Sequence, residues 1–201
     1  MHMSLRGDRT KQDIRDKAYQ LFAEKGFKEV TMKDICERTG LSRGGLYRHY
    51  ESTEQIFLEI VNGFSEQQKN DVFTKIQQCV PAVVILEEFL ARYEREMNDS
   101  ENSFNLAICE YYSDPAISKE DNDVKRQYEI SKATWTALIS YGIDTKEFNR
   151  VNPESVFHIL VFAYQGVRTY SRLMEIDRDI PNQIITEIKG LLMPKEVSHG
   201  E

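Results

Sequence analysis

The chain has 201 residues, of which 40% are hydrophobic and 29% are charged, and its formal net charge is −7. This length accommodates one or two small domains with an ordinary globular core. The longest apolar runs, residues 80–86 and 159–164, are far shorter than the roughly 20 residues that span a bilayer. The composition therefore excludes a membrane-spanning helix, and a start without an apolar h-region predicts no signal peptide.

The cysteine content argues against a disulfide framework. Cys36, Cys79 and Cys109 are an odd number and lie far apart in the chain, a pattern that also lacks the paired spacing of a zinc site. We therefore expect a reduced, cytoplasmic protein with no metal and no cofactor. Cys36 is interpreted as a small core residue.

Residues 8–26 have the pattern of an amphipathic helix. Ile14, Ala18, Leu21 and Phe22 fall at i, i+4, i+7 and i+8, which places them on one face. Gly26 follows as the expected end of this helix.

Residues 31–50 predict two short helices around a glycine-centred turn. Thr31 is the expected N-cap of the first helix, with Asp34 able to return the hydrogen bond, and Gly40 supplies the positive φ that ends it. Ser42 is the expected N-cap of the second helix, whose buried residue is Leu46. Such a pair of helices is typical of a helix-turn-helix DNA reader.

The second helix of this pair contains two adjacent glycines, Gly44 and Gly45. Each costs about 1 kcal/mol relative to Ala in a helix, and an isolated Gly-Gly pair more often marks a loop. Here the flanking caps favour a reading helix whose missing side chains let its backbone approach the major groove, with Arg43 reaching guanine. The phosphate oxygens are expected to be contacted by Tyr47, His49 and Tyr50.

Residues 14–57, which read I..KAYQLFAEKGF.EVTMKDICERTGLSRGGLYRHYESTEQIF, resemble the TetR family of bacterial transcriptional regulators. The resemblance is specific over about fifty residues of this chain. It implies an all-α fold of about nine helices, with a three-helix helix-turn-helix domain at residues 8–68 and a helical-bundle domain for ligand binding and dimerisation at residues 69–194. It also implies a homodimer that binds double-stranded DNA at a palindromic operator.

The predicted DNA-contacting residues come from the reading motif and its flanks. They are Lys33, Ser42, Arg43, Gly44, Gly45, Tyr47, Arg48, His49, Tyr50 and Thr53. One departs from the resemblance, because the family usually has a lysine where this chain has Thr53. A threonine releases no counterion, so we expect the salt dependence of DNA binding to be shallower by about one charge per subunit.

The acidic net charge is concentrated away from the reading motif. Residues 1–64 contain 11 Lys and Arg against 10 Asp and Glu, whereas the remaining residues contain 15 against 23. Because the N-terminal part is nearly neutral, DNA affinity is expected to come from a few well-placed groups and from the avidity of a dimer.

The rest of the chain is predicted to be helical. Ser52 and Gln55 indicate a capping box that opens a helix to about residue 78, and Pro81 opens another to about residue 97. A short helix is expected at residues 104–112 and a long one at residues 119–141. Gly142 is the expected cap of the long helix, and Phe148 anchors the following loop.

The last two predicted helices, residues 153–170 and 181–192, have the pattern of an interface. The first is apolar over too wide an arc for a single core face, although both helices could instead be buried within one chain. By resemblance to the family, they pair with their copies in a four-helix dimer interface. The expected interface residues are Val156, Leu160, Gly166, Val167, Tyr170, Ile184, Ile188 and Leu191.

A small-molecule effector is expected among the C-terminal helices. The resemblance implies a cavity there, and filling it would change the distance between the two helix-turn-helix motifs of the dimer. Each aromatic residue taken singly is more often plain core than pocket lining. Tyr111 and Tyr112 are the first choice, because buried phenols need hydrogen-bond partners. The candidate residues are Phe89, Phe104, Ile108, Tyr111, Tyr112, Trp135, Phe162, Tyr164 and Arg168.

The sequence thus predicts a ligand-responsive transcriptional regulator, a repressor released by a small molecule, and not an enzyme. Neither an HExxH motif, a phosphate-binding glycine loop nor a GxSxG motif is present. Two alternatives stay open at this point: an activator, and a helical small-molecule-binding protein or enzyme whose DNA-binding domain is vestigial.

Overall fold

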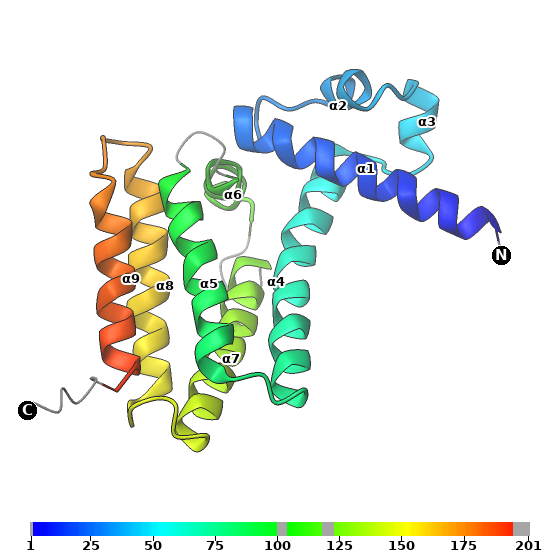
Figure 1. The fold of residues 1–201 in the computed structure, drawn as a ribbon. Helices are drawn as coiled ribbons and strands as arrows, with labels where there is room; N and C mark the ends of the chain where they lie inside the picture. Colours follow the sequence, from blue (N-terminus) through cyan, green and yellow to red (C-terminus); the bar gives the residue numbers. More distant parts are fainter. Residues whose placement is uncertain (1, 100–103, 118–122, 195–201) are drawn as a thin grey trace, which may run out of the picture. The chain divides into compact units, whose positions relative to one another are not determined.

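The computed structural model describes residues 2–99, 104–117 and 123–194. Within these ranges the chain forms nine helices and no strand, so the predicted all-α fold is confirmed (Figure 1). The helices are α1 (His2–Lys25), α2 (Met32–Thr39), α3 (Arg43–Tyr47), α4 (Thr53–Gln77), α5 (Ala82–Asn98), α6 (Asn105–Tyr112), α7 (Asp123–Asp144), α8 (Pro153–Tyr170) and α9 (Asp179–Leu192). None of these helices is both long and apolar enough to cross a membrane.

The chain divides into two compact units. The first, called here the reading unit, comprises Met1–Ser65 and Glu101–Gln127, and the second, called the bundle unit, comprises Glu66–Ser100 and Tyr128–Glu201. The first break in the chain lies close to the predicted boundary at residues 68 and 69. The grouping of residues 101–127, which include α6, with the reading unit was not predicted from the sequence.

An aromatic core holds the reading unit together. The Phe57 ring from α4 lies 5.4 Å from the Phe22 ring of α1 and 5.3 Å from the Phe104 ring that precedes α6, measured between ring centroids. The predicted inner face of α1 is confirmed, since Ile14, Ala18 and Phe22 are fully buried. This core fixes α6 against α1 and α4.

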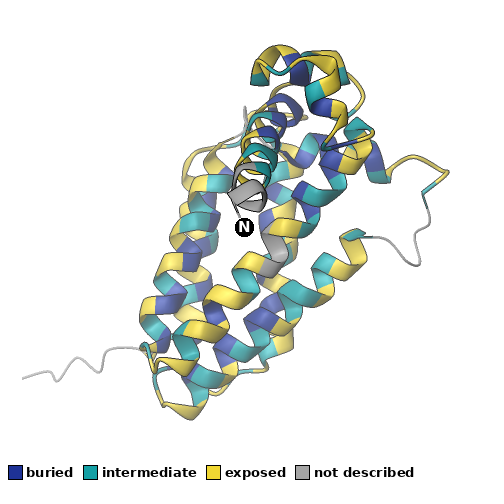
Figure 2. Ribbon diagram, turned by 90° about the vertical axis from the view of Figure 1, so that its right-hand side faces the viewer, coloured by how far each residue is buried: buried dark blue, intermediate teal, exposed yellow. Residues whose placement is uncertain are grey.

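In the bundle unit, α5, α8 and α9 pack side by side (Figure 1). Their buried side chains form one core with those of α7, centred on Leu86, Trp135 and Leu160. Buried residues line the inner sides of these helices, and exposed residues follow their outer sides (Figure 2).

The end of α7 differs from the predicted one. The helix continues through Gly142 to Asp144, so Gly142 is not its cap; residues 119–122 of the predicted helix lie outside the described residues. Gly142 is needed for another reason, because a Cβ there would overlap the ring of Phe148. Phe148 is buried in the core and anchors its loop, as predicted.

Candidate functional site

Helix α2 begins and ends at the predicted residues. The Thr31 hydroxyl accepts a hydrogen bond from the Asp34 N–H at 3.2 Å, and the Asp34 carboxylate accepts one from the Thr31 N–H at 2.9 Å. Hydrogen bonds from the Thr31 hydroxyl and N–H, and then from Lys25, lower the pKa of Asp34 to about 2. Gly40 ends the helix in the left-handed conformation, with φ of 72°. The predicted capping box and glycine cap are confirmed.

Helix α3 is short and turns one side outward. The Ser42 hydroxyl accepts a hydrogen bond from the Gly45 N–H at 3.1 Å, which confirms Ser42 as the N-cap. Leu46 is fully buried and attaches the helix to the core, whereas Arg43 and Gly44 are exposed. A Cβ added to Gly44 would meet no heavy atom of the described residues within 4 Å, so packing within this part of the chain does not require a glycine there.

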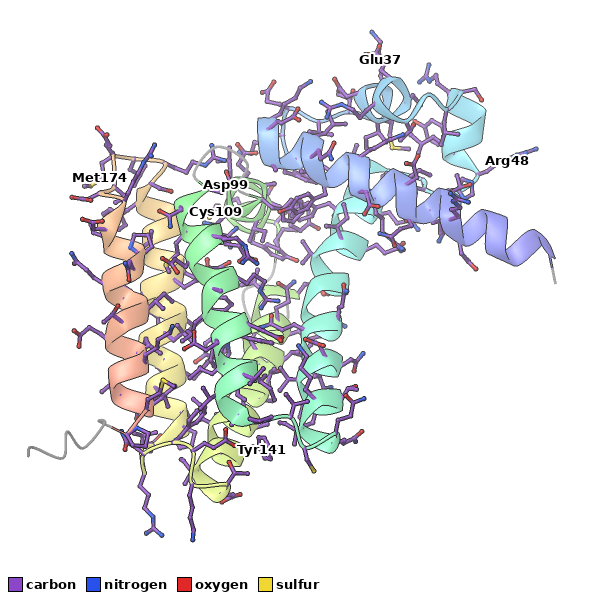
Figure 3. The ribbon with its side chains drawn as sticks, viewed as in Figure 1. Glu37, Arg48, Asp99, Cys109, Tyr141 and Met174 are labelled. Atoms are coloured by element: carbon purple, nitrogen blue, oxygen red, sulfur yellow. The ribbon has the colours of Figure 1, made fainter. Side chains whose placement is uncertain are left out.

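The basic residues of the reading unit differ in how far their charges are neutralised. Lys17, Lys25 and Arg38 are paired with acidic residues at 2.7 to 3.1 Å. Across the described ranges, neither Arg43 nor Arg48 forms an ion pair, and Figure 3 shows the Arg48 side chain extending away from the end of α3. The uncompensated cations of the reading motif therefore lie on and directly after α3.

The remaining predicted DNA contacts are more varied in exposure. Tyr47 is exposed, His49 is half-buried, and Lys33 is exposed with Glu37 3.7 Å away. Thr53 is the first residue of α4, directly after Ser52, whose hydroxyl accepts a hydrogen bond from the Gln55 N–H at 3.1 Å. The Gln55 side chain accepts from the N–H of Glu51 rather than of Ser52, so the predicted capping box is present in a shifted form.

Tyr50 is buried, whereas the sequence predicted it on the surface that contacts the DNA phosphates. Its side chain is 1% exposed, and burial, followed by the nearby charge of Glu59, raises the pKa of its hydroxyl to about 12. The Lys11 ammonium lies 5.1 Å from the ring centroid of Tyr50. The hydroxyl is therefore not accessible to a phosphate in this conformation, contrary to the expectation, because the ring packs into the core.

Helix α8 has two apolar faces, which accounts for its wide apolar arc. Of the expected interface residues, Val156, Leu160 and Val167 face inward and are buried in the chain's own core, as is Ile188 on α9. The expectation that these residues contact a second copy is corrected, because a helix turns about 100° per residue and the two faces interleave. The other expected residues, Gly166, Tyr170, Ile184 and Leu191, are exposed or half-buried.

The outer face of the two helices forms a shallow apolar groove. Its lining combines one side of α8 with one side of α9, namely Ile159, Ala163, Gln183, Ile184, Glu187, Ile188 and Leu191. Phe162 is exposed on the same helix, so it is not the pocket residue that the sequence suggested. Ile159 was missed, although it lies three residues before Phe162 and seven before Gly166, which is the spacing of one helix face.

Four of the candidate ligand residues lie together in a polar-aromatic cluster inside the bundle unit, namely Phe89, Trp135, Tyr164 and Arg168. The Trp135 Nε1–H donates to the Tyr93 hydroxyl at 3.0 Å, and the rings of Tyr93 and Tyr164 stack 4.3 Å apart. The Tyr164 hydroxyl donates to Glu96 and accepts from Arg168 at 2.7 Å. Phe89 packs edge-on against Trp135. The sequence interpretation missed Tyr93 and Glu96, whose i, i+3 spacing places them on one side of α5.

Four other candidates lie in the core of the reading unit. Phe104, Ile108, Tyr111 and Tyr112 pack there with Phe57. The Tyr111 hydroxyl donates to Glu54 at 2.5 Å, and the Tyr112 hydroxyl donates to Asp123 at 3.3 Å. The two phenol groups therefore already have hydrogen-bond partners within the chain and do not need a ligand to supply them. Burial raises the pKa of both tyrosines.

These features define a class of protein. Two capped helices around a left-handed glycine, with an exposed arginine and glycine on the second, form a helix-turn-helix DNA-binding unit, here joined to a separate helical bundle. Residues 14–60 match the family model of bacterial regulatory proteins, tetR family. These residues therefore form a TetR-type helix-turn-helix region, and the relatives that the chain resembles are named as transcriptional regulators.

Individual relatives extend the similarity to different shares of the chain. An uncharacterized HTH-type transcriptional regulator, YfiR, of Bacillus subtilis is 28% identical over 148 residues, which are 73% of this chain and 71% of YfiR. The HTH-type transcriptional repressor KstR2 of Rhodococcus jostii is 38% identical over 68 residues, 34% of this chain and only 31% of KstR2. A solved TetR regulator from Haloarcula marismortui has the same fold, with a TM-score of 0.70 and 16% identity over 92% of this chain and all of that one.

Proposed function

We propose that this regulator is a cytoplasmic repressor that binds a palindromic operator as a homodimer and leaves it when a small molecule binds the bundle unit. The observation that carries this proposal is the outward side of α3. It presents Arg43, which has no ion-pair partner among the described residues, and the exposed Gly44, while Leu46 is buried in the core.

The proposed base reading centres on Arg43. Its side chain leaves the first turn of α3, the part of a recognition helix that contacts base edges, and guanine O6 and N7 match its paired donors. Arg48 and the Tyr47 hydroxyl serve the phosphates. Arg43→Ala should cost about 1 to 3 kcal/mol and relax the preference at one base pair, whereas Tyr47→Phe should weaken binding to all sequences alike.

The proposed dimer uses the groove face of α8 and α9. Ile159 is 54% exposed and Phe162 is 65% exposed, which is unusual for large apolar side chains on one continuous helix face. A twofold interface would bury this face against its copy. Sedimentation analysis should find a dimer, and Phe162→Glu should shift it to monomer; a wild-type protein that is monomeric at micromolar concentration would contradict the proposal.

The proposed effector site is the cluster of Tyr93, Trp135 and Tyr164. These residues bring hydroxyl and indole groups into an otherwise apolar core, where a few placed polar groups are typical of a small-molecule site. Glu96 and Arg168 add opposite charges at the same cluster. Release requires the effector to bind more tightly to a conformation in which the two reading units of the dimer do not match the spacing of the operator half-sites. The coupling free energy between effector binding and DNA binding would be about 1 to 3 kcal/mol.

Helix α6 is the proposed route of this coupling. It follows α5 and precedes α7 in the chain, but it is held within the reading unit by side chains on two of its turns. Its Glu110 carboxylate accepts a hydrogen bond from the Lys28 N–H at 3.1 Å, in the loop between α1 and α2, and the Tyr111 hydroxyl donates to Glu54 on α4. In this proposal, a change in the bundle unit acts on the reading motif through α6.

Selection of duplexes from a random-sequence pool by the purified protein tests the proposal. We expect an enriched palindrome whose half-sites lie a whole number of DNA turns apart, about 34 to 36 Å per turn. A thermal-shift screen of small molecules should then find compounds that both stabilise the protein and release the selected duplex. Enrichment of no sequence would contradict operator recognition, and transcription in vitro from a promoter containing the palindrome separates repression from activation.

A further inference from the structure

The reading unit has few cations available for the DNA backbone. Thr53 at the start of α4 is uncharged, and within the described residues Lys17, Lys25 and Arg38 are paired with carboxylates. Backbone contacts supply a large share of DNA affinity, mainly through lysine and arginine side chains that displace counterions. Arg48 is the cation of the reading motif that was assigned to the phosphates, which leaves room for a further phosphate-binding cation outside the motif.

Lys11 on α1 lies beside Tyr50, the last residue of the reading motif, although the two are 39 residues apart in the sequence. Its ammonium is 5.1 Å from the centroid of the Tyr50 ring, and Tyr50 lies three residues before the start of α4. The Lys11 side chain is 40% exposed while Tyr50 is 1% exposed, so Lys11 is the outer group of the pair. It therefore occupies the surface where the sequence placed the Tyr50 hydroxyl.

The charge of Lys11 is only partly compensated. The nearest carboxylate, Glu59 on α4, has one oxygen 4.0 Å from the Lys11 ammonium, and its other oxygen binds the guanidinium of Arg15. The single carboxylate of Glu59 is shared by the cations of Lys11 and Arg15, so these three groups together carry a net positive charge. A lysine has a flexible four-carbon stem, so its ammonium can leave a 4.0 Å pair for a stronger phosphate contact.

We propose that Lys11 contacts the DNA backbone beside the reading motif and supplies the cation that Thr53 does not. The inference rests on the proposed mode of DNA binding, in which α3 lies in the major groove and the residues that follow it meet the flanking phosphates. Helix α1 thereby takes part in DNA binding as well as in the core of the reading unit.

The salt dependence of DNA binding measures this contact directly. Lys11→Met removes the charge but keeps most of the apolar stem that covers the Tyr50 ring. Binding is measured by fluorescence anisotropy between about 50 and 200 mM salt, with the selected palindrome and with a mixed-sequence duplex of the same length. The slope of log K against log salt should become shallower by about 0.9 per subunit on both duplexes.

Lys17→Met is the matched control. It lies on the same helix and changes the net charge by the same amount, but its ammonium is 3.1 Å from Asp13 on its own helix. Its slope should stay at the wild-type value. If both variants change the slope equally, the effect comes from the net charge of the protein and not from a contact of Lys11, and the proposal is overturned. An unchanged slope in a stably folded Lys11→Met protein would also overturn it.

A second lysine should rescue the variant. Thr53→Lys in the Lys11→Met protein places a cation at the start of α4 and should restore the wild-type slope, whereas failure of this rescue in a folded protein would place the contact elsewhere. If Lys11→Met does not fold, Glu59→Gln tests the same contact in the other direction. Removing the carboxylate that competes for Lys11 should steepen the slope, and an unchanged or shallower slope would overturn the proposal.

The two duplexes separate this inference from the proposed function. A wild-type protein that binds no duplex contradicts the proposed operator binding. A wild-type protein that binds the mixed-sequence duplex but selects no palindrome contradicts sequence reading, while the slope difference between wild type and Lys11→Met still decides the role of Lys11.

Discussion

Gly44→Ala should strengthen the fold and weaken DNA binding. An added Cβ at Gly44 would have no heavy atom within 4 Å, so the substitution introduces no clash within the described chain. Replacing a helical glycine by alanine gains up to about 1 kcal/mol of unfolding free energy. On the DNA the same methyl group would separate the α3 backbone from the groove, and crowding of this kind typically costs about 1 to 3 kcal/mol, roughly a tenfold to a hundredfold loss of affinity.

Two measurements on one protein give this result. Urea unfolding should be followed by circular dichroism, because the single tryptophan, Trp135, lies in the other unit. Binding to the selected palindrome is measured by fluorescence anisotropy. Gly63→Ala is the control, since Gly63 is also helical with open space around an added Cβ; it should be stabilised without losing affinity. If Gly44→Ala binds the palindrome as tightly as wild type, the backbone of α3 does not approach the DNA closely.

Three further predictions concern the fold. Asp34→Ala should cost about 1 kcal/mol at neutral pH. Since the carboxyl has a lowered pKa of about 2, the advantage of wild type is complete above about pH 4 and should shrink as the pH falls toward 2, which urea titrations at several pH values would show. Gly142→Ala should destabilise the bundle unit by about 1 to 3 kcal/mol through overlap with Phe148, and Phe148→Leu should relieve part of this loss in a double-mutant cycle. Tyr93→Phe leaves the Trp135 indole N–H without its acceptor and should lower the thermal midpoint by an amount equivalent to about 1 to 3 kcal/mol; an unchanged midpoint would show that this hydrogen bond contributes little.

The reading motif could be predicted from the sequence because its signals are local. The caps at Thr31 and Ser42 act within three residues of themselves, and Gly40 sets its own backbone conformation. Each signal operates over a distance shorter than the helix that it bounds, so no knowledge of the remaining chain is needed. Leu46 was predictable for the same reason, since a five-residue helix with one large apolar side chain has one way to attach itself to a core.

Helix α8 shows where a periodic pattern stops being sufficient. The sequence correctly indicates that the apolar arc is too wide for one core face, but two apolar faces have the same period. Only the packing against α5 and α9 decides that Leu160 faces inward and Phe162 faces outward. Gly142 is a similar case, because a glycine near a helix end has the same local signature whether it caps the helix or admits the ring of Phe148.

The position of α6 depends on contacts that no local pattern encodes. This helix is apolar on several sides, so its sequence is compatible with a place in either unit. Its placement follows from Glu110 and Tyr111, whose partners lie 82 and 57 residues away in the chain. Because those partners hold the loop before α2 and the first turn of α4, the tyrosines first chosen as ligand contacts are better explained as attachments of the reading unit.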